Sequence, residues 1–300
     1  MIPTINRNYE KVALVTGCSS GIGHALVESL SKYPNIKVYA SARNVSSISK
    51  LKSENVDIVQ LDVCDNNSIK EAIDTILQKE EKIDILINNA GINIYGPVID
   101  LTDEDNRRMM DTNFFGVVNV VREVAKHMIP RKSGLIANIG SPGGWISNPY
   151  VGMYCASKAA IHFWTDALRM ELAPFDIKVS LVVPGAIQSD IAMKAQPSLQ
   201  ELLKRTLYQP IKDYIIMRAG TSQQHDMTAL QFSDYAIAQL LKPSVPITFS
   251  YGPLTTLFKI YSILPKFITD YMFSKRLGLL KLRELLSSGN TNAHLFKKEQ

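Results

Sequence analysis

Tyr154 and Lys158 stand four residues apart and are the pair in this chain best suited to acid–base chemistry. On a helix, residues at this spacing share one face, so a phenol and an ammonium can act together. A free tyrosine titrates near ~10, but a cation about 4 Å away could lower that pKa by up to ~3 units at an effective dielectric of about 20. Such a phenol could protonate a carbonyl oxygen as hydride reaches the carbon. A surface Tyr–Lys pair is the alternative, so the interpretation depends on the residues upstream.

A glycine-rich turn far upstream could hold the cofactor that such chemistry needs. The segment Gly17-Cys-Ser-Ser-Gly21-Ile-Gly23 follows a buried strand expected at 11–16 and precedes a helical pattern at 24–33. Gly17 permits the tight turn, Gly21 lets backbone amides approach a pyrophosphate, and Gly23 allows close packing of helix and strand. The spacing is GxxxGxG rather than GxGxxG, and a turn without a ligand is the alternative. The pattern predicts a dinucleotide cradle.

The second strand, expected at 36–42, is followed directly by Arg43. In a dinucleotide fold the adenosine ribose lies at this strand end, where Asp or Glu binds a free 2′-hydroxyl and Arg suits a 2′-phosphate. No acidic residue stands there, so NADP(H) is the favoured cofactor. The alternative is that Arg43 is only solvated. Asp62 and Val63 follow the third strand and could flank the adenine.

Strands and helices alternate along the chain, and their order positions these residues. Strands are expected at 11–16, 36–42, 56–61, 83–87, 135–139, 177–183 and 245–250. Helices are expected at 24–33, 68–79, 102–128, 154–174 and 226–241. This order predicts an α/β fold, a doubly wound parallel sheet of the Rossmann type with right-handed crossovers. Ligands of such sheets bind at the carboxyl ends of the strands. Six candidate residues follow their strands at that edge: Gly17, Arg43, Asp62, Asn89, Ser141 and Gly185.

Taken in order, these motifs resemble the short-chain dehydrogenase/reductase family. The matching residues are Thr16-Gly17-x-x-x-Gly21-x-Gly23, Asn88-Asn89-Ala90-Gly91, Asn113, Ser141, Tyr154-x-x-x-Lys158 and Pro184-Gly185, and the resemblance spans about residues 10–250. It implies that Tyr154 is the proton donor or acceptor and that Lys158 lowers its pKa and holds the nicotinamide ribose. It also implies that Ser141 orients the substrate carbonyl and that Asn113 supports a water relay.

The resemblance further implies which residues bind NADPH or NADP. Ser189 stands where the family usually has Thr after Pro-Gly, and its hydroxyl could reach the nicotinamide amide. The predicted cofactor-binding residues are Gly17, Ser19, Ser20, Gly21, Ile22, Gly23, Arg43, Asp62, Val63, Asn89, Ala90, Gly91, Tyr154, Lys158, Pro184, Gly185, Ile187 and Ser189.

Two subgroups share further stretches of the chain. Residues 250–276 and the segment from Tyr154 to His162 resemble fungal-type NADPH-dependent 1-acyldihydroxyacetone-phosphate reductases of the endoplasmic reticulum and lipid droplets. The segments 17–23 and 38–43 look like those of 17β-hydroxysteroid and retinol dehydrogenases. We therefore expect an NADPH-dependent reductase of a lipid ketone, foremost 1-acyldihydroxyacetone phosphate. The alternatives are a hydroxysteroid or retinol dehydrogenase and, more remotely, a cofactor-binding scaffold without turnover.

Composition excludes several other classes. With 300 residues, 46% of them hydrophobic and 20% charged, the chain can bury a full core. Its net charge of +5 is modest and does not indicate nucleic-acid binding. Three separated cysteines without a CxxC, and five scattered histidines, predict neither a disulfide scaffold nor a metal site. Residues 1–11 lack an apolar signal core, so we expect no secretion.

We expect one Rossmann domain over residues 1–250, with a substrate lid at about 190–225 and a C-terminal extension over 251–300. A homodimer is compatible with the sequence. Basic residues of the lid could attract an anionic headgroup, although a solvated lid face is the alternative. They are Lys194, Lys204, Arg205, Lys212 and Arg218.

The extension carries an apolar stripe at helical spacing, interrupted by Pro265. The stripe comprises Leu257, Phe258, Tyr261, Leu264, Ile268 and Met272, with Lys259, Lys266 and Asp270 opposite. A basic cluster follows at Lys275, Arg276, Lys281 and Arg283. No stretch reaches 18 apolar residues, so we expect this segment to lie on an anionic membrane rather than span it. The predicted site is the cytosolic face of the endoplasmic reticulum or a lipid droplet, and otherwise the cytoplasm. The alternative is packing on the protein's own core or on a dimer mate.

Overall fold

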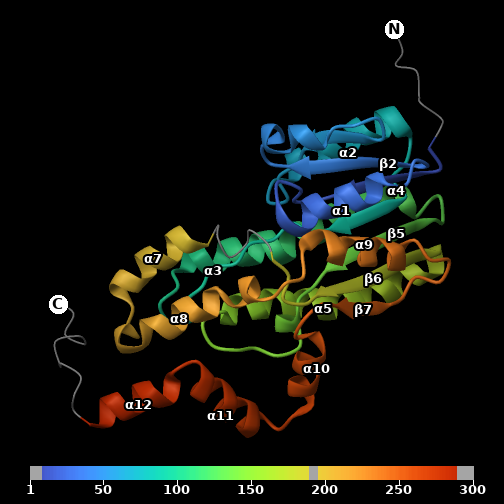
Figure 1. Ribbon diagram of the computed structural model, residues 1–300. Coiled ribbons are helices and arrows are strands. Elements are labelled where there is room, and N and C mark those ends of the chain that lie inside the picture. Colours follow the sequence, from blue (N-terminus) through green and yellow to red (C-terminus); the bar gives the residue numbers. More distant parts are fainter. Residues whose placement is uncertain (1–8, 189–194, 289–300) are drawn as a thin grey trace.

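Seven parallel strands form one sheet in the computed structural model, which describes residues 9–188 and 195–288 (Figure 1). The strand order is β3-β2-β1-β4-β5-β6-β7, so the chain winds outward from the centre first in one direction and then in the other. This is the doubly wound arrangement, whose switch point lies between β1 and β4. The strands are β1 Lys11–Val15, β2 Ile36–Ala42, β3 Val56–Gln60, β4 Ile85–Asn88, β5 Gly134–Ile139, β6 Ile177–Pro184 and β7 Thr248–Tyr251.

Helices cover both faces of the sheet, as expected where strands are apolar on both sides (Figure 1). One face packs against α2, α4 and α5, with Ile73, Val120 and Ile161 buried between the layers. The other face packs against α1 and α9, with Leu26 and Phe232 fully buried. These helices are α1 Gly21–Ser31, α2 Asn66–Glu80, α4 Gly116–Met128, α5 Gly152–Leu172 and α9 Ala229–Leu240. The predicted α/β fold class is confirmed.

The helix expected at 102–128 is interrupted. α3, Asp103–Met110, begins at a capping box of Thr102 and Asp105 and leads into a π-helical turn at Asp111–Phe115, after which α4 continues. A π-helical turn accommodates one extra residue per turn and occurs frequently at functional sites. Here the turn contains Asn113, whose fully buried side chain bonds the backbone of a distant loop at Ile92. The interruption therefore follows from a contact between distant segments, which the helical periodicity of the sequence cannot predict.

The seventh strand starts later than expected, at Thr248 rather than Val245. Pro246 has no N–H for the ladder, and its carbonyl oxygen accepts a hydrogen bond from Ser180 Oγ at 2.7 Å. Pairing with β6 begins only beyond this proline, with Thr248 opposite Leu181.

Two lid helices and three C-terminal helices lie beyond the carboxyl end of the sheet (Figure 1). The lid helices are α7 Gln196–Arg205 and α8 Lys212–Ala219, and the C-terminal helices are α10 Thr255–Ile263, α11 Lys266–Arg276 and α12 Leu279–Ser287. Leu277 is buried in a cluster with Tyr95, Tyr150 and Ile215, and its carbonyl oxygen accepts the Tyr150 hydroxyl at 2.7 Å. The C-terminal extension thus packs on the lid.

Most of the apolar stripe predicted from the sequence is half-buried, with Phe258 lining the cavity and Met272 exposed. Tyr261 meets Phe273 edge to face at 5.8 Å between ring centroids, and both are half-buried. A different set of apolar side chains faces solvent around the bend between α10 and α11: Ile260, Ile263, Phe267 and Tyr271, which are 48%, 82%, 74% and 59% exposed. We call these four residues the elbow. Within the described residues, no helix combines the length and apolarity needed to cross a bilayer.

Candidate active site

The glycine-rich turn is held against the end of β4 by hydrogen bonds from the Asn88-Asn89-Ala90-Gly91 segment. Thr16 Oγ1 accepts from the backbone N–H groups of Asn89 and Ala90 at 3.0 and 3.1 Å. The Asn89 amide donates in return to the carbonyl oxygens of Thr16 and Gly17. β1 and β4 are neighbours at the switch point, so these bonds fix both walls of the crevice in which dinucleotides bind.

Two of the three glycines have a steric requirement here. Gly17 has φ +73°, and a Cβ there would lie 2.7 Å from the Cα of Ala90. A Cβ on Gly23 would lie 2.3 Å from both Gly17 O and Asn89 Nδ2. Gly17 thus permits the tight turn, as predicted. Gly23 also allows close packing, but its neighbours are the turn itself and Asn89. The amides that open α1 have no intrahelical acceptor and can bind an anion.

At the other end of the crevice Arg43 follows β2, is exposed and lines the cavity. Burial raises the pKa of the nearby Cys64 thiol, and the charge of Arg43 is the smallest of the effects that oppose this shift. Asp62 Oδ1 accepts from the N–H of Cys64 at 3.0 Å and shapes the loop after β3. Arg108, on α3, also lines the cavity. The guanidinium group of Arg43 is therefore available where a 2′-phosphate would lie.

Tyr154 and Lys158 lie on α5 facing the end of β5. Lys158 is buried, and its ammonium donates to the carbonyl oxygen of Ile139 at 2.8 Å. Its Nζ lies 5.9 Å from the centroid of the Tyr154 ring. Ser141 Oγ accepts from the N–H of Gly143 at 3.1 Å, which leaves its hydroxyl hydrogen free to point elsewhere.

The predicted lowering of the Tyr154 pKa is wrong for this structure. Burial raises the pKa of Tyr154 to about 12, and hydrogen bonding to Ser141 opposes this effect only in part. Burial also lowers the pKa of Lys158 to about 8. Desolvation is the largest cause of both shifts, and Lys158 is not among the charges that lower the pKa of Tyr154. The phenol is protonated at neutral pH and is suited to donate a proton.

Asn113 lies behind the site rather than in the cavity. Its Oδ1 accepts from the N–H of Ile92 at 2.8 Å, and its Nδ2 donates to Ile92 O and to Ser157 Oγ. Ser157 in turn donates to the carbonyl oxygen of Tyr154 at 2.7 Å. Asn113 therefore ties the loop after β4 to the helix of the Tyr154–Lys158 pair.

His162, one turn beyond Lys158 on α5, supports the loop that contains Ser141. Its Nε2 accepts from the N–H of Ser141 at 3.2 Å. The imidazole fills the space beside Gly140 and Gly144, where an added Cβ would lie 2.4 and 2.5 Å from ring atoms. Burial, with a contribution from the Lys158 charge, lowers the pKa of His162 to about 4. A neutral imidazole is consistent with its role as a hydrogen-bond acceptor.

A single cavity of about 690 Å³ joins the glycine-rich turn to Tyr154 and continues under the lid. Apart from Asn113 and Ser189, every residue predicted from the sequence for catalysis or cofactor binding lines it. Ser189 lies outside the described residues. A dinucleotide fits this cavity, because the cavity is lined by the start of α1 with its backbone amides, by Arg43 and by the Tyr154–Lys158 pair. Together these residues fit NADP(H).

The substrate end of the cavity contains residues that the motifs did not identify. Side chains of the C-terminal extension form part of its wall: Leu254, Phe258, Phe273, Arg276 and Leu277. The loop before α5 contributes Asn148, and the lid contributes Met217 and Arg218. Phe258 is the one member of the predicted apolar stripe that lines this wall, which agrees with the alternative that part of the stripe packs on the protein itself.

Comparisons with known proteins agree with this geometry. Residues 11–200 match the family described as short chain dehydrogenase. The chain is 40% identical over 178 residues to a 3-ketodihydrosphingosine reductase of Bacteroides thetaiotaomicron, covering 58% of this chain and 63% of that protein. It is 31% identical over 270 residues to an NADPH-dependent 1-acyldihydroxyacetone phosphate reductase of Schizosaccharomyces pombe, covering 85% of this chain and 90% of the relative.

A solved structure extends the comparison to three dimensions. The closed form of a serine dehydrogenase complexed with NADP+ superposes with a TM-score of 0.69 at 27% identity, covering 81% of this chain and 95% of that one. The match thus includes most of the sheet and helices described above. The chain belongs to the short chain dehydrogenase family and is an oxidoreductase acting on CH–OH or C=O groups.

Proposed function

We propose that this protein is an NADPH-dependent reductase of a lipid ketone, foremost 1-acyldihydroxyacetone phosphate, which it converts to 1-acylglycerol 3-phosphate. The observation that supports this most is the continuous cavity, which starts at the glycine-rich turn, passes Tyr154 and ends against apolar side chains of the extension such as Phe258. A long acyl chain needs such an apolar wall beside the reacting carbon. The Schizosaccharomyces pombe relative, which matches over most of both chains, acts on this kind of lipid ketone by its name.

The proton chemistry follows from three side chains. When bound, the nicotinamide cofactor supplies the hydride that reaches the carbonyl carbon. Tyr154 transfers its phenolic proton to the carbonyl oxygen, and Ser141 Oγ donates a hydrogen bond to the same oxygen and orients it. The buried ammonium of Lys158 stabilises the phenolate that remains. Because burial raises the pKa of Tyr154 to about 12, the phenol holds the proton that reduction requires at neutral pH.

NADP(H) is supported over NAD(H) by charge at the adenosine end. Arg43 lines the cavity directly after β2, where a 2′-phosphate would otherwise be unpaired, and Arg108 lines the same cavity. One relative is named for NADPH dependence, and one superposable structure holds NADP+. Arg43, Arg108 and the amides that open α1 would hold the cofactor's phosphates.

We also propose that the enzyme takes its substrate from an anionic membrane, docking by the elbow. α10 and α11 each present one side chain to the cavity and another to solvent: Phe258 and Ile263 on α10, Phe273 and Phe267 on α11. A lipid leaving a bilayer at the elbow would therefore enter between the same two helices. The exposed Lys266 and Lys275 add positive charge suited to anionic lipid. The cytosolic face of the endoplasmic reticulum or a lipid droplet remains the proposed location.

Turnover of a ketone panel tests the function directly. Purified protein is assayed for NADPH oxidation with 1-acyldihydroxyacetone phosphate, 3-ketodihydrosphingosine, a 17-ketosteroid and retinal. We expect the acyl ketone phosphate to be reduced, and Tyr154→Phe to lose about 10²- to 10⁴-fold in turnover while NADPH binding persists. Tyr33→Phe, outside the cavity, is the control.

Three results would overturn the proposal. Near-normal turnover by Tyr154→Phe would refute the assigned proton donor. Preference for the steroid or retinal would favour the alternative dehydrogenase, and NADPH binding without turnover of any ketone would indicate a scaffold.

A further inference from the structure

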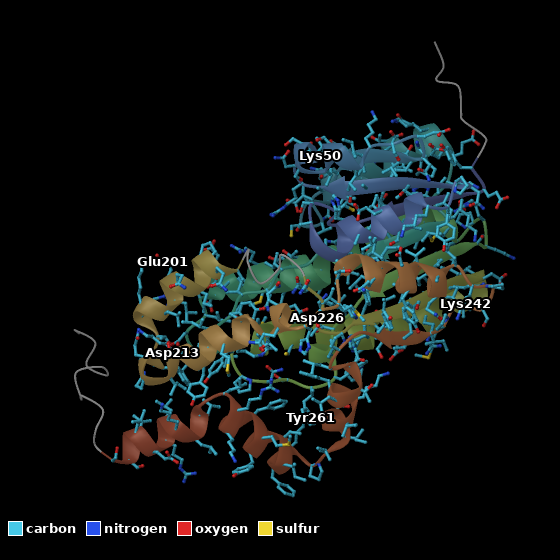
Figure 2. All side chains as sticks on the ribbon, in the orientation of Figure 1. Lys50, Glu201, Asp213, Asp226, Lys242 and Tyr261 are labelled. Carbon is cyan, nitrogen blue, oxygen red and sulfur yellow. The ribbon has the colours of Figure 1, made fainter. Side chains whose placement is uncertain are left out.

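Two arginines meet at the substrate end of the cavity, one from the lid and one from the C-terminal extension. Arg218 lies near the end of α8, and Arg276 is the last residue of α11. Both line the same cavity as Tyr154 and Ser141. In Figure 2, Asp213 is labelled on α8 and Tyr261 on α10, the first helix of the C-terminal extension. Residues more than fifty positions apart thus bring two positive charges together.

Arg218 is held in a defined orientation. Its Nε donates to Asn148 Oδ1 at 2.7 Å, and Asn148 is itself buried. This bond uses the Nε edge of the guanidinium group and leaves the terminal Nη groups available to a ligand. Arg276 is anchored by the residue that follows it, because Leu277 is buried in the lid cluster and its carbonyl oxygen is bonded to Tyr150. The Arg218 side chain is therefore oriented before any ligand arrives, and the backbone position of Arg276 is fixed.

Neither arginine forms an ion pair with any residue in the described part of the chain. The ionisable groups around Arg218 are Tyr95, Tyr154 and Cys155, which are neutral at pH 7, and Arg276 adds repulsion. Burial lowers the pKa of Arg218 accordingly. Removing the Arg218 charge from water without a counter-ion is unfavourable, and the charge of the exposed Arg276 adds repulsion, so an anion bound beside both would offset this cost.

We propose that Arg218 and Arg276 form an anion subsite that binds the phosphate of a lipid ketone while its carbonyl lies at Tyr154. This deepens the proposed function and rests on it. Guanidinium groups bind phosphate oxygens through paired N–H bonds, which gives both affinity and orientation. The subsite selects a ketone phosphate over an amino ketone such as 3-ketodihydrosphingosine, whose ammonium the two arginines repel. The substrate class is thus decided by charge at this end of the cavity.

Binding without turnover tests the subsite first. The probe is 1-octanoylglycerol 3-phosphate, with 1-octanoylglycerol as its uncharged counterpart, titrated into the full-length protein by calorimetry. We expect Arg218→Gln and Arg276→Ala each to weaken binding of the phosphate by about 10- to 100-fold and to leave the uncharged lipid unaffected. Arg205→Ala is the matched control, because Arg205 is exposed and does not line the cavity.

Kinetics separates the subsite from a structural role. Each variant is assayed with 1-acyldihydroxyacetone phosphate and with its dephosphorylated ketone, and we expect KM to rise only for the phosphate. Arg218→Lys should recover part of the loss, since it keeps the charge. Equal losses for both ketones, or unchanged phosphate binding, would overturn the subsite.

Different results would contradict the proposed function and the anion subsite. If the wild-type protein reduces no ketone but binds the lipid phosphate through both arginines, the proposed function is wrong and the subsite stands. If it reduces the ketone phosphate and the arginine variants behave like the control, the subsite is wrong. Arg276→Ala alters an exposed helix end, so this test remains available if Arg218→Gln fails to fold.

Discussion

At the scale of single residues, burial decides the charge states of the candidate active site. Tyr154 has a raised pKa and Lys158 a lowered one, each mainly through desolvation. The phenol is thus a proton donor that becomes a stabilised phenolate only when the reaction delivers charge to it. Neighbouring charge contributes less than water exclusion in this site.

The lowered pKa of His162 predicts a specific acid sensitivity. Its pKa is about 4 in the folded chain against a usual 6.5, so between these values the unfolded chain holds a proton that the folded chain does not. The free energy of unfolding should therefore fall on acidification through this window, by at most on the order of 3 kcal/mol. His162→Gln, which can still accept from Ser141, should flatten this dependence.

Urea unfolding near pH 7 and at about pH 4.5 measures the effect. His127→Gln, on α4, is the matched control. An unchanged pH dependence in His162→Gln would contradict the assignment.

Arg43 should determine which cofactor binds. Arg43→Ala should weaken NADPH binding by about 1.5–3 kcal/mol, the range for charge-assisted hydrogen bonds, and barely change NADH binding. Titrations of both cofactors provide the measurement, and Arg107→Ala, exposed and outside the cavity lining, is the control. Equal losses for both cofactors would show that Arg43 does not contact the 2′-phosphate.

At the scale of elements, the C-terminal extension acts as a wall of the active site. α10 and α11 supply Phe258 and Phe273 to the cavity, and Leu277 joins the buried cluster that supports the lid. The Rossmann core and the extension therefore share one binding site.

Leu277 is the side chain by which this coupling can be tested. It is 4% exposed, so Leu277→Ala should destabilise the protein by about 2–5 kcal/mol and raise KM for the lipid ketone. Leu286→Ala, on α12 and 47% exposed, should stay within about 0.5 kcal/mol of the wild type. Thermal unfolding and steady-state kinetics compare the two variants. Similar behaviour of both would mean that the extension does not support the lid.

At the scale of the whole molecule, the elbow is the surface proposed to meet a membrane. Ile263 and Phe267 are its most exposed members. Their joint replacement, Ile263→Ser with Phe267→Ser, should abolish flotation with vesicles containing phosphatidylserine and leave turnover of a short-chain ketone intact. Ile247→Ser, 55% exposed at the amino end of β7, should float like the wild type.

High salt should release part of the bound wild-type protein, because the basic contribution is screened. Flotation of the double variant equal to that of the wild type would rule out the elbow as the docking surface. The homodimer stays a prediction, and light scattering of the purified protein tests it.

The order of strands, the glycine-rich turn and the Tyr154–Lys158 spacing were determined by local sequence. Period-two and period-3.6 patterns and glycine positions act over a few residues, and the strands of a parallel sheet end at one edge whatever their distance in the chain. The predicted cofactor-binding residues that the structure describes therefore line one cavity.

Tertiary structure alone decided the rest. The side of the extension that faces the cavity, the interruption at Asn113, the charge states of Tyr154 and Lys158, and the meeting of Arg218 with Arg276 depend on contacts between distant segments. Periodicity identifies an apolar face but not what covers it, and a pKa depends on the water that the folded chain excludes. For that reason the sequence indicated the chemistry, and packing determined the electrostatics and the shape of the substrate end.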